Sequence, residues 1–346
     1  MMMPINNSNQ PHVTLPNDTP TVAHTFHSGS PSQTTTIIHD DSEYHAVWSS
    51  WKEGAPVGGG EKRDIAVERM HYALAMKSAF LDLSELSLSS LPDLIPDQLE
   101  ELYLDKNQIH LLPENMPKGL KALSVNDNEL TALPKTLPKN LLVLSACNNQ
   151  LELLPNLIPE QLEQLYLDKN IIHVLPEYMP EDLQILSVND NQLTALPKTL
   201  PKNLLVLSAC DNQLELLPDI WPKELYKITL CRNALKTFPE NLPSSLSILK
   251  ISHNQLGGAI GRLPDKLEYA DLHHNKLNGV PNALPKNLQR IDISNNNLEV
   301  LSECVLLSTE SLLIYLSGNP LSENTIQKLL SHPRSASDSG PIFILP

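Results

Sequence analysis

A leucine recurs every 21 residues through most of this chain, and this spacing constrains the fold more than any other feature. The recurring leucines are Leu99, Leu120, Leu141, Leu162, Leu183, Leu204, Leu225, Leu246, Leu267 and Leu288. An asparagine follows eight residues after each of them, from Asn107 to Asn296, and another stands at Asn319. A fixed period of roughly 20–50 residues is typical of repeat proteins, whose successive units stack along one axis. The sequence therefore predicts a stack of short units in place of several compact domains.

Each unit follows the pattern L-x-x-L-x-L-x-x-N-x-L-x-x-L-P-x-x-x-P, which is the leucine-rich-repeat consensus. Its L-x-L core predicts a short strand with inward leucines, and parallel strands of neighbouring units would lie about 4.8 Å apart. The asparagine amide can satisfy backbone groups where the chain turns. Two prolines per unit, such as Pro113 and Pro117, disfavour a helical return. We expect a leucine-rich-repeat solenoid, a curved parallel β-sheet horseshoe with an extended, polyproline-like convex side.

Segments of different character flank the repeats. The start is rich in Ser, Thr, Asn, Pro and His and has no apolar periodicity, which predicts disorder. Two short amphipathic helices follow, the first around Trp48 and the second over Glu61–Ser78, and Ser322 can cap a helix after the last repeat. The expected segments are a disordered region over 1–41, an N-terminal helical cap over 42–77, about 12 repeats of 21 residues over 78–320, and a C-terminal cap over 321–346.

Charge and composition narrow the classes of partner. The formal net charge of -15 makes nucleic acid an unfavourable partner, because phosphate binding needs a clustered basic surface. No run of about 18 apolar residues predicts a membrane span, and the first forty residues lack the pattern of a secretory signal peptide. The four cysteines are scattered through the repeats, as expected for a reducing compartment. A protein partner remains.

The strands of the predicted sheet present one set of side chains to solvent. Because side chains alternate along a strand, we expect the third, fifth, seventh and eighth positions of each unit on the concave face. This column runs from acidic to basic, which would orient a partner, although any solvated sheet face carries polar residues. Tyrosines are the strongest candidates for contact energy. The candidate partner-binding residues are Tyr103, Asp105, Asp127, Tyr166, Asp168, Asp190, Asp211, Lys227, Arg232, Lys250, His253, Tyr269, His273 and Arg290.

The same column raises the question of a metal site. Cys210, Cys231, His253 and His273 fall on successive strands, one per repeat, at spacings of 20–22 residues. Zinc ligands usually come in closely spaced pairs, so we expect no metal here. No nucleophile triad, phosphate loop or pair of carboxylates indicates catalysis, and an open sheet face does not exclude water. We expect no catalytic site and no cofactor.

A family resemblance rests on three stretches outside the repeat pattern. These are Trp48-Ser-Ser-Trp51, the run Arg63-Asp-Ile-Ala-Val-Glu-Arg-Met, and the ending Gly318-Asn-Pro-Leu-Ser. Together with the Leu-Pro repeats, they resemble the bacterial type III secreted leucine-rich-repeat effectors of the IpaH, SspH, SlrP and YopM group, over roughly 42 to 346. The polar start resembles their secretion signals. The resemblance implies secretion into a host cell, with the cytoplasm or the nucleus as destination, and binding of a host protein through the repeats.

One feature of that group is missing from the pattern. Many members carry a C-terminal E3 ubiquitin ligase domain with a catalytic Cys-x-Asp motif, whereas none of the four cysteines here is followed two residues later by Asp. We therefore expect a host-binding effector that is non-catalytic by itself. One alternative is the substrate-recognition portion of a ligase whose catalytic domain is missing from this chain. A second is an intracellular structural repeat protein that is not secreted.

Overall fold

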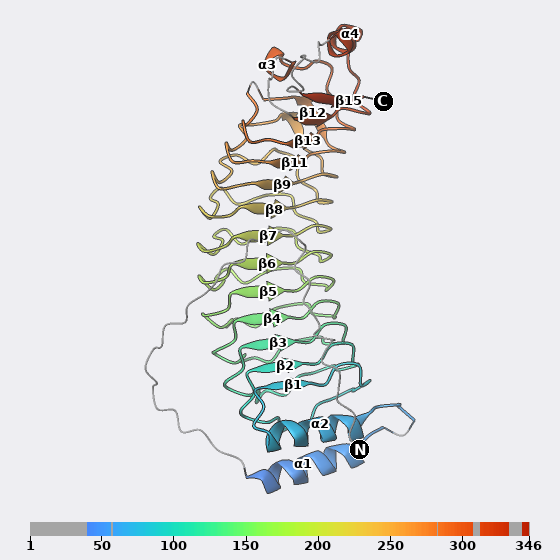
Figure 1. Cartoon of the computed structure of the whole chain (residues 1–346), viewed down its shortest axis with the longest axis vertical. Coiled ribbons are helices and arrows are strands. Elements are labelled where there is room, and N and C mark those ends of the chain that lie inside the picture. Colours follow the sequence, from blue (N-terminus) through green and yellow to red (C-terminus); the bar gives the residue numbers. More distant parts are fainter. Residues whose placement is uncertain (1–39, 57, 282, 307–311, 332–340, 346) are drawn as a thin grey trace, which may run out of the picture. The chain divides into compact units, whose positions relative to one another are not determined.

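The protein is described here from a computed structural model, shown in Figure 1. It describes residues 40–345 apart from 57, 282, 307–311 and 332–340. The predicted disorder of residues 1–41 lies outside the described residues except at its last two positions. There, Asp40 caps the first helix and Asp41 begins it.

Short parallel strands, one per repeat unit, form the main sheet (Figure 1). Thirteen strands of the described chain follow the order β1-β2-β3-β4-β5-β6-β7-β8-β9-β11-β13-β14-β15. They are β1 (Phe80–Asp82), β2 (Glu101–Tyr103), β3 (Ala122–Ser124), β4 (Val143–Ser145), β5 (Gln164–Tyr166), β6 (Ile185–Ser187), β7 (Val206–Ser208), β8 (Lys227–Thr229), β9 (Ile248–Lys250), β11 (Tyr269–Asp271), β13 (Arg290–Asp292), β14 (Leu313–Tyr315) and β15 (Ile342–Ile344). A separate parallel pair joins β10 (Gly257–Ala259) to β12 (Lys276–Gly279). The predicted parallel solenoid is confirmed.

The register of the sheet follows the period of the sequence. Residues 21 apart are direct neighbours on adjacent strands, as for Tyr103 and Ser124 in β2 and β3. The middle residue of each strand is buried wherever the unit follows the consensus, for example Leu102 and Leu165. Stacked leucines therefore form one continuous core along the sheet, as the L-x-L pattern predicts.

Buried asparagines connect each turn to the next. In Asn170, Nδ2 donates to the carbonyl oxygens of Ala146 (2.9 Å) and Leu167 (3.0 Å), while Oδ1 accepts from the Leu151 N–H (3.0 Å). Equivalent bonds recur from Asn107 to Asn319. The amide thus satisfies backbone groups that the turn leaves unpaired, which confirms the role expected for it.

The residue before each of these buried asparagines, from Asn107 to Asn296, has a left-handed backbone. At this eighth position φ lies between 52° and 56° in ten successive units. The residues are Lys106, Asp127, Asn148, Lys169, Asp190, Asp211, Arg232, His253, His274 and Asn295. Asparagine and aspartate tolerate this conformation better than most residues do. Asn148 and Asn295 consequently show which neutral side chain fits there.

Two helices cover the first repeat. They are α1 (Asp41–Glu53) and α2 (Arg63–Ala75), and α2 packs against β1. The α1 residue Trp48 is fully buried, and its indole N–H donates to the Leu94 carbonyl at 2.8 Å. The second helix is shorter than predicted at both ends, because Lys62 (ψ 52°) and Lys77 (φ 48°) have non-helical backbones.

The other end of the sheet carries α3 (Glu303–Leu306), α4 (Glu323–Ser331) and the last two strands. Ser322 Oγ accepts from the Thr325 N–H at 3.2 Å, so the predicted helix cap is confirmed. Within the described part of the chain, no helix is long and apolar enough to cross a membrane.

Candidate functional site

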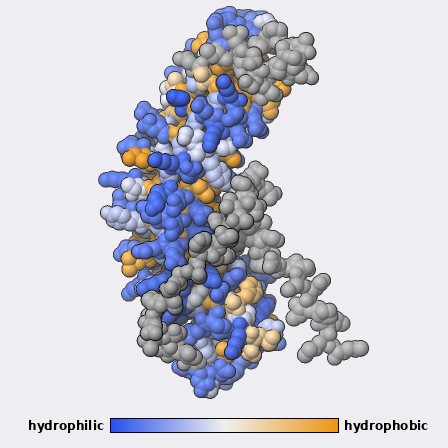
Figure 2. Space-filling view, turned by 60° about the vertical axis from the view of Figure 1, so that its left-hand side comes forward, coloured by the Kyte–Doolittle hydropathy of each residue, from blue (hydrophilic) through white to orange (hydrophobic). Residues whose placement is uncertain are grey.

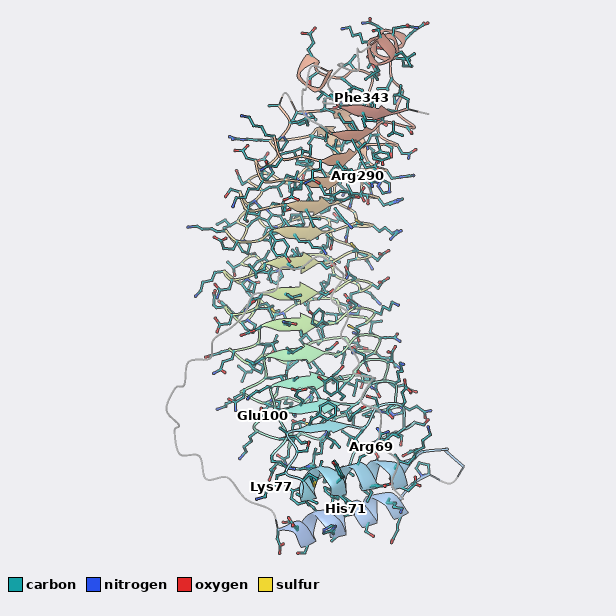
Figure 3. All side chains as sticks on the ribbon, in the orientation of Figure 1. Arg69, His71, Lys77, Glu100, Arg290 and Phe343 are labelled. Carbon is teal, nitrogen blue, oxygen red and sulfur yellow. The ribbon has the colours of Figure 1, made fainter. Side chains whose placement is uncertain are left out.

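The strand face, as we call the surface formed by the third, fifth, seventh and eighth positions of the units, is the candidate site. The third and fifth residues of a unit flank the buried middle residue of its strand and point away from the core. Figure 3 shows the side chains that project from the stacked strands, among them Arg290 from β13. The view in Figure 2 is mostly hydrophilic, with small separate hydrophobic patches.

All fourteen predicted partner-binding residues occupy these four positions. None of them is fully buried, and Asp127, Asp190 and Arg232 are exposed. The remaining eleven are half-buried between neighbouring units. Their role in partner binding stays a prediction. The structure shows, however, that some of them are hydrogen-bonded to neighbouring turns and others are not.

The seventh position has a structural role that sequence reasoning missed. Asp168 accepts hydrogen bonds from the Ser187 hydroxyl (2.8 Å) and the Asn189 N–H (2.6 Å). Asp105 does the same for the next unit, with Ser124 and Asn126 as donors. These carboxylates hold adjacent turns together. Burial is the largest influence on both and raises the pKa of Asp105 and of Asp168.

Asparagine performs the same task one turn further along the sheet. Asn189 Oδ1 accepts from the Ser208 hydroxyl (2.8 Å) and the Cys210 N–H (2.7 Å), so a neutral oxygen satisfies both donors. A buried carboxylate incurs a desolvation cost that an amide avoids. The charge at Asp168 is therefore not needed for the bonds that it makes.

We expect Asp168→Asn to increase stability at pH 7. A carboxyl group with a raised pKa in the folded state disfavours folding when charged, and this penalty disappears as the pH falls below its ordinary value. The gain over wild type should shrink as the pH is lowered towards 4, which urea unfolding at several pH values would measure. The exposed Asp190→Asn variant serves as the control. A lower stability of Asp168→Asn at pH 7 would show that the charge itself is required.

The outward charges lie mainly at the eighth position. Asp127, Asp190 and Asp211 precede Arg232, whose guanidinium lies 3.4 Å from the Asp211 carboxylate. Lysines also occupy this position in the acidic half, and Lys106 pairs with an acidic neighbour. The predicted gradient from acidic to basic stays a prediction. These lysines reduce the net negative charge at its acidic end.

An aromatic and cationic cluster occupies the basic half of the strand face. The Arg290 guanidinium lies 4.5 Å from the ring centre of Tyr315 and 5.5 Å from that of Tyr269. The Lys250 ammonium lies 5.4 Å from the Tyr269 ring. Cations over aromatic faces attract through the ring quadrupole. Tyr315 was missed in the sequence because the unit before it is 23 residues long, although it holds the fifth position of its own unit like Tyr103.

Thiols occupy the seventh position in three units, and imidazoles occupy the seventh and eighth positions farther along the sheet. Cys147, Cys210 and Cys231 are free thiols. Burial raises the pKa of Cys147 to about 11, so this thiol stays protonated at neutral pH.

Beyond Cys231, the imidazoles of His253, His273 and His274 gather where units meet, with ligand atoms within 4.8 Å of one another. His274 was missed as a member of this group. These residues could hold a metal ion.

The sequence of this chain is similar to those of known bacterial proteins. A profile described as "Type III secretion system leucine rich repeat protein" matches residues 6–68. Outer membrane protein YopM of Yersinia pestis is 40% identical over 72 residues, 21% of this chain and 17% of YopM. E3 ubiquitin-protein ligase SspH2 of Salmonella typhimurium is 36% identical over 75 residues, 22% of this chain and 10% of the ligase. The sequence matches thus span less than a fifth of these relatives.

The solved structures extend the likeness over the repeats. A structure of the leucine-rich effector YopM from Yersinia pestis superposes with a TM-score of 0.61 and 31% identity, covering 82% of this chain and 90% of that one. A leucine-rich-repeat protein of Leptospira interrogans follows with a TM-score of 0.55 and 26% identity, over 76% of this chain and 83% of that one. Both share the stacked parallel strands. With the helices and repeats matched together, this chain belongs to the family of type III secretion leucine-rich-repeat effectors.

Proposed function

We propose that this protein binds a host protein through its strand face. The observation that carries the proposal is the fixed register of the sheet, in which each fifth-position side chain stands beside its counterpart one unit away. A surface held by a hydrogen-bonded sheet loses little conformational freedom on binding. The outward tyrosines then supply contact area without first having to be ordered.

The tyrosines define two parts of this surface. Tyr103 and Tyr166 lie three strands apart, about 14 Å at ordinary strand spacing, whereas Tyr269 lies about 24 Å beyond Tyr166. An interface of standard size buries about 800 Å² on each partner and reaches across roughly 30 Å. We therefore assign Tyr103 and Tyr166 to one contact region, and Tyr269 with Arg290 to a neighbouring one.

We expect the Tyr103→Ser, Tyr166→Ser double variant to lose at least about tenfold in affinity for the host partner, since removal of a single interface hot spot costs about 2 kcal/mol or more. Serine occupies the same fifth position at Ser124 and Ser187, so the scaffold accommodates it. Affinity capture from host-cell lysate, followed by titration of the captured protein, measures the loss.

The matched control is Tyr178→Asn. Tyr178 is 86% exposed and lies outside the strand face, and the residue at the same position three repeat units earlier is Asn115. This variant should capture the same proteins as wild type. Equal capture by the double tyrosine variant would move the binding surface away from Tyr103 and Tyr166.

A second candidate function rests on the likeness to SspH2. The matched segment belongs to a protein named as an E3 ubiquitin ligase, which favours substrate recognition for ubiquitin transfer as an alternative. Because the catalytic domain of that alternative lies outside this chain, the test fuses this chain to the catalytic domain of a related ligase. Ubiquitin transfer from the fusion to the captured host protein, with activating and conjugating enzymes supplied, would favour the alternative. Several hundred further codons with a Cys-x-Asp motif downstream of this sequence would also favour it.

Delivery into the host cell is part of the proposal, with the cytoplasm as the main destination. The family profile covers residues 6–68, the part of the chain in which a secretion signal is expected. A reporter fused to residues 1–68 should leave a bacterium only when its type III apparatus is intact. Retention of the reporter would favour the unsecreted repeat protein considered above.

A further inference from the structure

Three histidines meet at the junction of two neighbouring repeat units. His253 follows β9, whereas His273 and His274 follow β11, which is the neighbour of β9 in the sheet. The rings of His253 and His274 stack with centres 4.4 Å apart. The Nε2 atoms of His253 and His273 are 3.1 Å apart. All three ligand atoms lie within 4.8 Å of one another.

The hydrogen bonds fix which nitrogen of His273 is available. Its Nδ1 contacts the Asp271 carboxylate, which can only accept, so Nδ1 carries a proton and Nε2 is the nitrogen directed towards His253. The Ser252 hydroxyl donates to the other oxygen of Asp271 at 3.3 Å and holds this carboxylate in place. A carboxylate behind a histidine is the usual support of a metal-binding imidazole.

We propose that His253, His273 and His274 bind a divalent transition metal ion, and that zinc is the ion they suit best. With Zn–N bonds of about 2.0–2.1 Å, tetrahedral geometry places ligand nitrogens about 3.3 Å apart. The observed 3.1 Å between two of them is close to this value, and the third is within reach of a ring rotation. Three protein ligands leave a fourth position for water or for a group of a bound partner.

The surroundings balance the added positive charge. Arg232 precedes His253 by one unit at the eighth position, and its positive charge opposes a cation. On the other side of the cluster, ligand atoms of Asp271 and Asp292 lie within 4.8 Å of a His273 nitrogen. The two carboxylates thus lie beside the histidine cluster and reduce the repulsion that a divalent ion would meet there.

The repeat explains why the ligand spacing in the sequence does not indicate the proposed site. Zinc ligands are expected in close sequence pairs because a short turn brings them together. Here the sheet register does the same for residues one unit apart, since His253 and His274 are separated by 21 residues. The regular spacing that argued against a metal in the sequence is therefore what assembles the ligands.

The test uses the full chain without a histidine tag and zinc chloride alone as ligand. Calorimetric titration should give one site with micromolar or tighter affinity. His253→Asn and His273→Asn should each weaken binding by at least about 100-fold. Asparagine is native at both places in other units, as Asn148 and Asn189, so the fold accommodates the changes. Asp271→Asn, which acts through His273, should weaken binding by about 10–100-fold.

The matched control is His173→Thr. His173 is an exposed histidine away from the cluster, and Thr194 holds the same position in the next unit. This variant should bind zinc as wild type does. Cobalt bound to wild type should show the strong visible absorption of a tetrahedral ion, which His273→Asn should lose. Zinc binding no tighter in wild type than in the folded His253→Asn, His273→Asn double variant would overturn the proposal.

Discussion

Replacement of Asn170 by alanine should lower the free energy of unfolding by about 3–5 kcal/mol, because a buried backbone group left without a partner costs about 1–3 kcal/mol. The side chain of Asn170 satisfies three such groups, the carbonyls of Ala146 and Leu167 and the N–H of Leu151. Alanine satisfies none of them. The residue is buried, so bulk water does not reach the vacated groups without opening the turn.

Urea unfolding of the purified chain measures this loss. Asn203→Ala is the matched control, because the Asn203 amide donates only to an exposed aspartate at 3.3 Å. Its effect should stay within about 0.5 kcal/mol. In a stack of repeats each unit contacts only its neighbours, so faster hydrogen exchange in Asn170→Ala should centre on the units that contain Leu151 and Asn170. Equal shifts of the unfolding midpoint in both variants would mean that water replaces the buried amide.

The repeat architecture was predictable because each constraint occurs many times. One leucine at Leu102 would indicate little, but its counterparts at 21-residue steps require an inward side chain in every unit. The asparagine ladder adds an independent requirement with the same period. Agreement of two patterns over ten units leaves few folds that satisfy both.

The sequence did not show which residues of the strand face hold adjacent turns together and which are available to a partner. Sequence reasoning placed Asp105 and Asp168 among the binding residues because it counted positions and charges alone. Their bonds reach the fifth and seventh positions of the next unit, as from Asp168 to Ser187. A signal existed, since serine stands 19 residues after Asp105, Asn126, Asp168 and Asn189 alike. Such a recurrent pair indicates a link between turns.

The histidine cluster shows a different limit. The sequence places His253 and His274 one unit apart, and this spacing predicts neighbouring side chains. It does not predict that Asp271 orients His273 towards His253, because that depends on side-chain rotation about a bond. The repeat period thus predicts the position of the backbone, whereas the orientation of the imidazole nitrogens depends on contacts among side chains.

Arg63 joins the helical cap to the first repeat, and its side chain is only 6% exposed. Its guanidinium pairs with Glu61 at 2.5 Å, donates to the Trp51 carbonyl and to the Ser90 hydroxyl, and lies over the Trp51 ring at 4.6 Å. The Glu61 side chain is 3% exposed and accepts from the Ser89 hydroxyl. One buried ion pair therefore ties α1 and α2 to the turn that follows β1.

Arg63→Ala should lower the free energy of unfolding by about 3–5 kcal/mol, because it leaves a buried carboxylate without its counter-charge. Replacing both partners, with Arg63→Met and Glu61→Gln, should cost less than the single change. Urea unfolding of the three proteins at pH 7 measures both effects. An equal loss in the single and double variants would assign the cost to lost packing and not to the charge.

The pH dependence separates the two causes further. Burial acts to raise the pKa of Glu61, but the bonds from Arg63 and Ser89 outweigh it and hold that pKa below its ordinary value of 4.5. A lowered pKa stabilises the fold above the ordinary value, and this contribution is lost as the pH falls through the lowered one. In Arg63→Ala burial dominates, so the pKa of Glu61 should rise and its penalty should disappear on acidification. The difference between wild type and Arg63→Ala should therefore narrow as the pH falls below about 4.5, whereas a packing defect would leave it constant.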